Sequence, residues 1–89
     1  MKNVYILLEH IKGFFVKDQK LFITCAYFFE DDSLEVCECK DPEIMDKKII
    51  YLQSLLKKYY TFKILKDRAF AFQCFVSTDQ IAKHGEPRE

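Results

Sequence analysis

Two cysteines one residue apart are the first residues of this chain that could do chemistry. Cys37 and Cys39 would place both thiols on the same face of a strand, where thiolates could bind zinc. A zinc site would need two further ligands, for which Cys25, Cys74 or His10 are available. Structural zinc sites usually space their paired cysteines more widely, so free buried thiols are the competing interpretation. A zinc-binding domain using Cys37 and Cys39 is therefore an alternative, and the main interpretation assigns neither a metal nor a cofactor.

Groups suited to acid–base or nucleophilic catalysis are few. His10 and His84 are the only histidines, and neither stands with a Ser, Cys or Asp in a recognisable catalytic arrangement. Acidic residues around Cys37 would raise the pKa of its thiol, which is the opposite of what a nucleophile needs. Gly13 and Gly85 are the only glycines, so a glycine-rich phosphate loop is excluded. The sequence therefore predicts a protein that is not an enzyme.

Charge is divided along the chain although the net charge is zero. Residues 30–46 carry eight acidic residues against Lys40 alone, a net charge of −7. Such a stretch could meet a basic protein surface, although a solvated hairpin also uses charge to discourage aggregation. The candidate partner-binding residues are Glu30, Asp31, Asp32, Glu35, Glu38 and, as an apolar residue among the polar positions of a helix, Ile50.

The next 22 residues have the opposite sign. Residues 47–68 carry seven basic residues against Asp67 alone, a net charge of +6. Lysines near Tyr59, Tyr60 or Phe62 could contact phosphates while a ring stacks on a base. A zero net charge and the lack of a known nucleic-acid motif make this an alternative function. Its candidate residues are Lys57, Lys58, Lys63, Lys66 and Arg68.

Length and composition indicate one folded domain. The chain has 89 residues, 49% of them hydrophobic and only two each of Gly and Pro, which is atypical of a disordered chain. We expect a compact domain over residues 1–77 and a polar, flexible tail over residues 78–89. The first apolar run, Val4 to Leu8, is too short for a signal peptide or a membrane span, so a cytoplasmic location is expected.

One helix is predicted over residues 42–59. Asp41 is suited to the N-cap, Pro42 to the first helical position and Glu43 to the positive end of the helix dipole. Apolar residues then recur at steps of three and four, which places them on one face of the helix. These residues are Met45, Ile49, Leu52, Leu56 and Tyr59.

Strands are predicted on both sides of this helix. Leu21–Phe29 is apolar on both faces, which favours a central strand, and turn residues would join it to Leu34–Cys39 as a hairpin. Thr61–Leu65 and Ala69–Val76 are predicted as a second hairpin. Residues 4–12 fit a helix or a strand bent at Gly13, and the strand is preferred.

These expectations combine into an α+β fold: an antiparallel sheet of four to five strands, covered on one face by the helix at 42–59. The favoured function is a small non-enzymatic protein-binding module of the inhibitor, immunity or adaptor type. It would occlude or bridge a protein partner, one with a basic surface, through the acidic hairpin rim and an aromatic sheet face. Association into a homodimer through apolar strands is an accompanying expectation.

Overall fold

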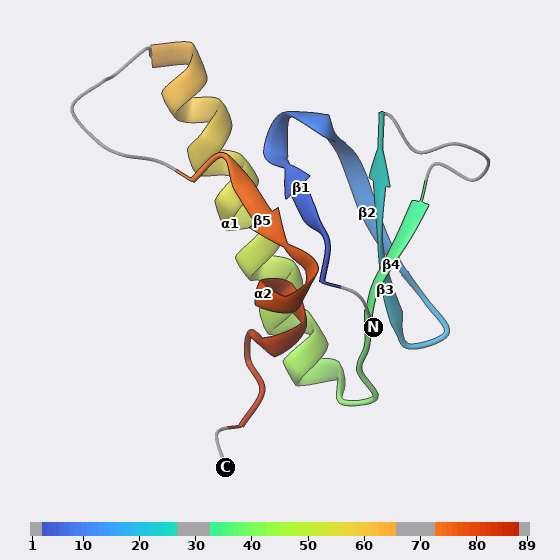
Figure 1. The fold of residues 1–89 in the computed structure, drawn as a ribbon. Helices are drawn as coiled ribbons and strands as arrows, with labels where there is room; N and C mark the ends of the chain where they lie inside the picture. The colour runs from blue at the N-terminus through green and yellow to red at the C-terminus, as the bar shows by residue number, and fades with distance from the viewer. Residues whose placement is uncertain (1–2, 27–32, 66–72, 88–89) are drawn as a thin grey trace.

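The computed structural model describes residues 3–26, 33–65 and 73–87. The chain has an α+β fold with antiparallel sheets, as the sequence predicts (Figure 1). In order, the elements are β1 (Tyr5–Leu7), the 3-10 turn η1 (Leu8–His10), β2 (Ile11–Lys17), β3 (Lys20–Cys25), β4 (Ser33–Glu38), α1 (Pro42–Leu65), β5 (Phe75–Ser77) and α2 (Thr78–Lys83). Within these residues, no helix is long and apolar enough to span a membrane.

Within the described residues the strands form two sheets, so the expected single sheet of four to five strands is not confirmed. One sheet has the order β2-β3-β4, and the other pairs β1 with β5. The turn η1 interrupts the chain between β1 and β2, and a register shift follows between Ile11 and Gly13. Because of this break, β1 leaves the first sheet and pairs near the other end of the chain. The preferred strand interpretation of residues 4–12 thus applies on both sides of η1.

The predicted sheet centre is confirmed by β3, which lies between β2 and β4. Leu21, Ile23 and Cys25 of β3 are buried, whereas Phe22 and Thr24 between them are half-buried. This alternation gives the sheet an inner face toward the helices and an outer face away from them. The predicted continuation of this strand to Phe29 lies outside the described residues.

Helix α1 begins as predicted but ends later. The Oδ1 atom of Asp41 accepts a hydrogen bond from the Glu43 amide at 2.9 Å, and the Asp41 carbonyl accepts one from Met45 at 3.0 Å. The prediction of a strand over Thr61–Leu65 is wrong, because α1 continues to Leu65. No Gly or Pro stands between Tyr59 and that residue, so nothing in the chain interrupts the helical hydrogen bonds.

A lysine lies on the buried face of α1. Lys48 follows Met45 by three residues and precedes Leu52 by four, and its side chain is completely buried. Its ammonium donates hydrogen bonds to the carbonyls of Ala82 and His84, at 2.7 and 2.8 Å, and to Oε1 of Glu86 at 2.7 Å. All three protons of the ammonium therefore have acceptors, which offsets the cost of burying its charge.

The structure differs from the expected tail over residues 78–89. Ser77 and Gln80 form a reciprocal capping box that starts α2, and Thr78 and Ile81 of this helix are buried. Beyond α2, the His84 ring stacks on Tyr51 with their centroids 4.1 Å apart. The described part of the expected tail is thus attached to the rest of the domain through Thr78, Ile81, His84 and Glu86.

We predict that Lys48→Met destabilises the fold by about 1–3 kcal/mol, because two carbonyls and the Glu86 carboxylate lose the donor that the buried ammonium supplies. The melting temperature should fall by roughly 4–8 °C for each kcal/mol lost in a domain of this size. Lys47→Met is the matched control, because Lys47 is exposed and should change stability by less than about 0.5 kcal/mol. Thermal and urea unfolding followed by circular dichroism measure both; equal stability of the two variants would contradict the prediction.

The turn between β2 and β3 holds two residues in a left-handed conformation. Asp18 and Gln19 have φ angles of 54° and 63°, as in a two-residue type I′ hairpin turn. Such turns favour glycine at the second position, because a side chain there is strained. The Gln19 carbonyl accepts a hydrogen bond from the Cys39 amide at 2.8 Å, which joins the turn to the end of β4.

We predict that Gln19→Gly stabilises the protein by about 0.5–1 kcal/mol, because glycine adopts the positive φ angle without strain. Gln19→Ala removes the same side chain but keeps Cβ, so it should bring no such gain. Urea denaturation of the two variants measures the difference in the free energy of unfolding. A larger gain from alanine than from glycine would refute a strained turn.

Candidate functional site

The outer face of the sheet β2-β3-β4 carries a stacked aromatic pair. Phe15 of β2 lies opposite Phe22 of β3, and Phe22 lies opposite Glu35 of β4. The two rings are 5.0 Å apart and only 13° from parallel. The neighbouring row consists of Lys17, Lys20 and Glu38. The strand register therefore places an aromatic patch beside a basic edge and an acidic edge.

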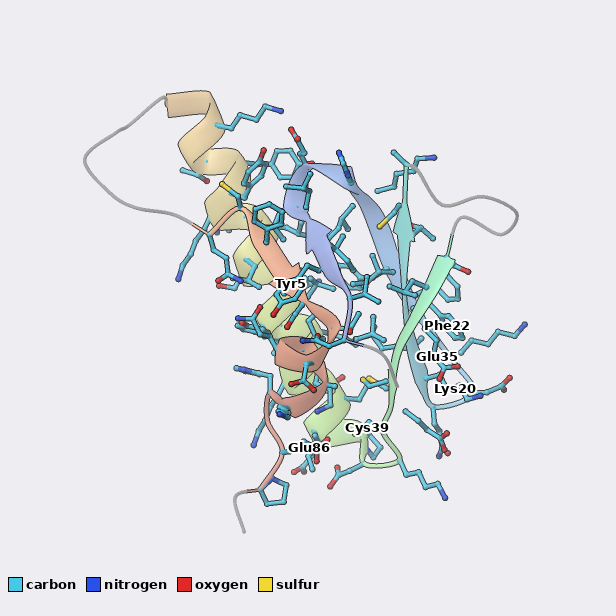
Figure 2. The ribbon with its side chains drawn as sticks, in the orientation of Figure 1. Tyr5, Lys20, Phe22, Glu35, Cys39 and Glu86 are labelled. Atoms are coloured by element: carbon cyan, nitrogen blue, oxygen red, sulfur yellow. The ribbon has the colours of Figure 1, made fainter. Side chains whose placement is uncertain are left out.

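This outer face lies away from both described helices. Figure 1 shows α1 and α2 on one side of the three-stranded sheet. Figure 2 shows Phe22, Lys20 and Glu35 pointing to the opposite side. Phe15 is 41% exposed, although it is one of the largest apolar side chains of the sheet. Exposed aromatic area with charged residues around it is typical of a surface that binds another protein.

The charges on this face are arranged across the strands. Lys20 forms an ion pair with Glu35, whose Oε1 lies 3.6 Å from the Lys20 ammonium. Both side chains are 39% exposed, so the pair contributes no more than about 1 kcal/mol to stability. Because a solvated pair of this kind separates easily, Glu35 remains available to a cation on a partner.

The structure brings together part of the predicted acidic rim. Glu35 and Glu38 are both exposed on β4 and share the outer face with the aromatic pair. Ile50 is 63% exposed, but it is half a helical turn away from Lys48 on α1 and faces away from the core. It therefore lies apart from the outer sheet face. The other predicted members, Glu30, Asp31 and Asp32, lie outside the described residues.

The predicted basic residues lie on different faces of α1. Lys57, Lys58 and Lys63 are all exposed. At 100° per residue, Lys57 and Lys63 lie on either side of Tyr60, whereas Lys58 lies on nearly the opposite side of the helix. Lys48, which contributes to the positive charge of this stretch, is buried and unavailable to an external partner. Lys66 and Arg68 lie outside the described residues.

The four cysteines differ in their exposure. Cys25 and Cys37 are buried, Cys39 is half-buried and Cys74 is exposed, all of them as free thiols. Burial raises the pKa of the Cys25 and Cys37 thiols, although the nearby Lys48 ammonium partly opposes this for Cys37. Among the described residues, no group of three or more His, Cys, Asp or Glu side chains could hold a metal ion.

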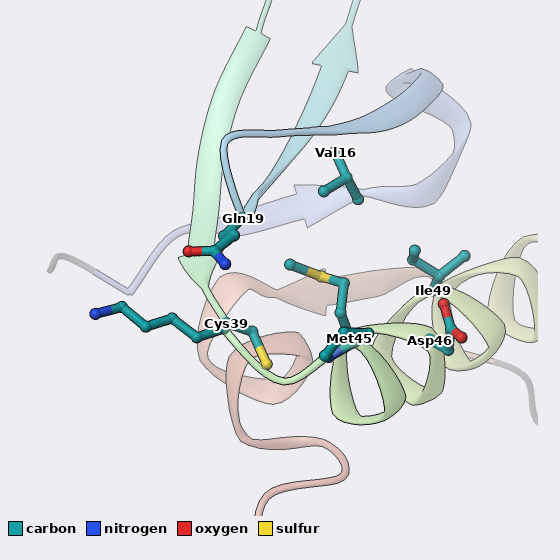
Figure 3. A pocket seen from close by; sticks show the side chains of 8 residues that line it. Val16, Gln19, Cys39, Met45, Asp46 and Ile49 are labelled. Atoms are coloured by element: carbon teal, nitrogen blue, oxygen red, sulfur yellow. The ribbon is translucent and has the colours of Figure 1, made fainter.

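A pocket that the sequence did not reveal lies between the β2–β3 turn and the first turns of α1. Its volume is about 370 Å³, and Figure 3 shows side chains from both elements surrounding it. Its lining is mostly apolar. The lining residues are Val16, Gln19, Cys39, Lys40, Pro42, Met45, Asp46 and Ile49. No sequence signal marks the turn that brings Gln19 to this pocket, because type I′ turns usually contain Asn-Gly or Asp-Gly and this one contains Asp-Gln.

No protein-family model, curated protein or solved structure matches this chain. The functional interpretation therefore depends on the surfaces described above.

We predict two rapidly and two slowly reacting thiols when the folded protein is labelled with a thiol reagent at pH 8. Cys39 and Cys74 should react first, because the other two are buried and their raised pKa values disfavour the thiolate.

The raised pKa values of Cys25 and Cys37 should also lower the free energy of unfolding as the pH rises above about 8.5, since the unfolded chain then loses protons that the folded chain retains.

Mass spectrometry of quenched labelling reactions assigns each thiol, and urea unfolding from pH 7 to 10 measures the pH effect. Equal labelling rates at all four cysteines would contradict the buried placement of Cys25 and Cys37. The variant Cys25→Ala should show a smaller loss of stability at high pH than the parent protein.

Proposed function

We propose that this chain is a small non-enzymatic protein-binding module of the inhibitor, immunity or adaptor type. Its contact surface is the outer face of β2-β3-β4. The observation that carries the proposal is the stacked Phe15–Phe22 pair, which lies on the sheet face directed away from the described helices. The module acts by occluding or bridging its partner, which requires a surface and no catalytic groups.

The chemistry of this face favours a partner that presents arginine. A guanidinium can stack on a phenylalanine ring and also form two hydrogen bonds with a carboxylate. Phe22 and Glu35 are directly opposite one another on neighbouring strands, so one arginine could contact both. Glu38 adds a second carboxylate on the same strand. These groups support the basic partner surface expected from the acidic stretch.

The stacking of the two rings supports a binding role for the aromatic pair. Stacking of Phe15 on Phe22 holds both rings in one orientation before a partner arrives. Side chains that are already ordered lose less conformational entropy on binding. Large aromatic residues near the centre of an interface also contribute a disproportionate share of binding energy.

Location and self-association belong to the same proposal. The four cysteines are free thiols, as expected in a reducing compartment, and this supports the cytoplasmic location.

A homodimer is the alternative occupant of the outer sheet face. In that case Lys17 on β2 of one copy could face Glu38 on β4 of the other, because these strands lie at opposite edges of the sheet.

We predict that the double variant Phe15→Thr/Phe22→Thr weakens partner binding at least about tenfold, because it removes the central aromatic area while keeping residues suited to strands. Tyr5→Thr is the matched control, since Tyr5 is a 71% exposed aromatic residue on the other sheet. A photo-crosslinking residue placed at Thr24, on the outer face, should capture the partner in nuclease-treated lysate. The captured protein, purified, is then titrated with each variant by calorimetry.

Charge reversal by Glu35→Lys/Glu38→Lys should also weaken binding, and by more at low salt than at high salt. Sedimentation of the purified protein alone separates a homodimer from a complex with another protein. Equal loss of binding in Tyr5→Thr and in the phenylalanine variant, or full binding by the latter, would refute the proposed face.

A further inference from the structure

A second surface of the molecule has a different character and lies on the C-terminal half of α1. Figure 1 shows this end of the helix extending past β1 and β5. Lys57, Tyr60 and Lys63 follow one another at intervals of three residues. On a helix this spacing forms a ridge, with about 9 Å along the axis between the two lysines. Tyr60 lies between them.

All three side chains of this ridge are exposed. Tyr60 is 40% exposed, and both lysines are exposed to solvent. The Tyr60 ring meets Tyr59 edge to face, with centroids 5.2 Å apart and planes at 83°. Tyr59 is hydrogen-bonded to the Glu9 carboxylate. Desolvation is the largest cause that raises the pKa of the Tyr59 hydroxyl, and the negative charge of Glu9 is the next. Tyr60 therefore rests on a neighbour that is itself held in place.

We propose that the ridge formed by Lys57, Tyr60 and Lys63 binds single-stranded nucleic acid. The order of cation, aromatic ring and cation matches the order of phosphate, base and phosphate along one strand. An exposed ring gives a base a stacking surface, and the flanking ammonium groups neutralise the phosphates on each side. A duplex hides the faces of its bases, so the ridge selects unpaired strands.

This surface is separate from the proposed protein-binding face. It lies on α1, whereas Phe15 and Phe22 lie on the outer face of the three-stranded sheet. The local positive charge carries the interaction although the net charge of the chain is zero. Either binding activity can therefore be present without the other.

The test is fluorescence anisotropy with a labelled twelve-residue oligothymidylate or oligouridylate, measured between 20 and 200 mM salt. Lys57→Gln and Lys63→Gln should each weaken binding about threefold or more. Each should also reduce the slope of log K against log salt by about 0.7, the value for one phosphate contact on a single strand. Tyr60→Leu should weaken binding at least about fivefold, whereas Tyr60→Phe should preserve it.

Lys58→Gln is the matched control, because it removes the same charge from the opposite side of the same helix. Its affinity should remain within twofold of the parent protein. An abasic oligonucleotide tests the role of the bases, and vesicles with anionic lipids test a membrane surface. Circular dichroism checks that each variant keeps its helix, which these exposed positions should permit.

Salt-sensitive binding that requires Lys57, Lys63 and an aromatic residue at position 60 would support the proposal. Equal affinity for DNA and RNA would show that the ridge recognises the phosphates and bases that both share. A preference for one of them would show that the sugar is a further contact. Any of four results would overturn the proposal. These are no binding at 20 mM salt, equal weakening by Lys58→Gln and Lys57→Gln, abasic strands binding as tightly as the intact oligonucleotide, and anionic vesicles binding as tightly.

Discussion

The buried ammonium of Lys48 joins helix α1 to the chain at the end of α2 and just after it. A charge in the core is tolerated only where its hydrogen bonds are complete, and here two carbonyls and a carboxylate supply them. Because both carbonyls follow the buried Ile81, the ammonium fixes the path of the chain after α2. Gly85 is suited to this path, since its φ is +83° and a side chain there would come within 3.1 Å of Cβ of Lys47.

The same region joins the beginning of the chain to its later part. The Val4 amide donates to the Thr78 hydroxyl at 3.0 Å, and the Thr78 amide donates to the Val4 carbonyl at 2.9 Å. The pairing of β1 with β5 continues this contact along two short strands. Since a pair of three-residue strands is marginal by itself, the packing of α2 and α1 must stabilise it.

Local signals predicted some of these elements well. Asp41 and Pro42 mark the start of α1 because capping is decided by neighbouring residues. The central position of β3 was also predictable, because both faces of this strand carry apolar side chains. The C-terminal end of α1 was missed because Thr61–Leu65 has the composition of a strand. A helix that has already formed adds further residues easily as long as no Gly or Pro interrupts its hydrogen bonds.

The remaining features depend on contacts between distant residues. Apolar periodicity assigns a lysine to solvent, so it could not reveal that carbonyls more than thirty residues away surround Lys48. Which phenylalanines face outward depends on two shifts of register, near Gly13 and near Phe22, and each shift changes the face that a side chain occupies. The sequence therefore located Glu35 and Glu38 on one arm of a hairpin, but strict alternation put them on opposite faces of it, and it could not place Phe15 beside Phe22. It predicted the exposure of Ile50, but not its separation from that face.

The pairing of β1 with β5 also has a consequence during protein synthesis. The chain passes through α1 before the strand that completes β1 and the carbonyls that enclose Lys48 have been made. At about 5–20 residues per second, the nascent helix exposes its apolar stripe for seconds, while the Lys48 ammonium is still hydrated by water. The hairpin of β2 and β3 can form earlier, because its contacts are local. The core can therefore close only after the chain through Glu86 has been made, so α1 must keep its apolar stripe exposed in the meantime.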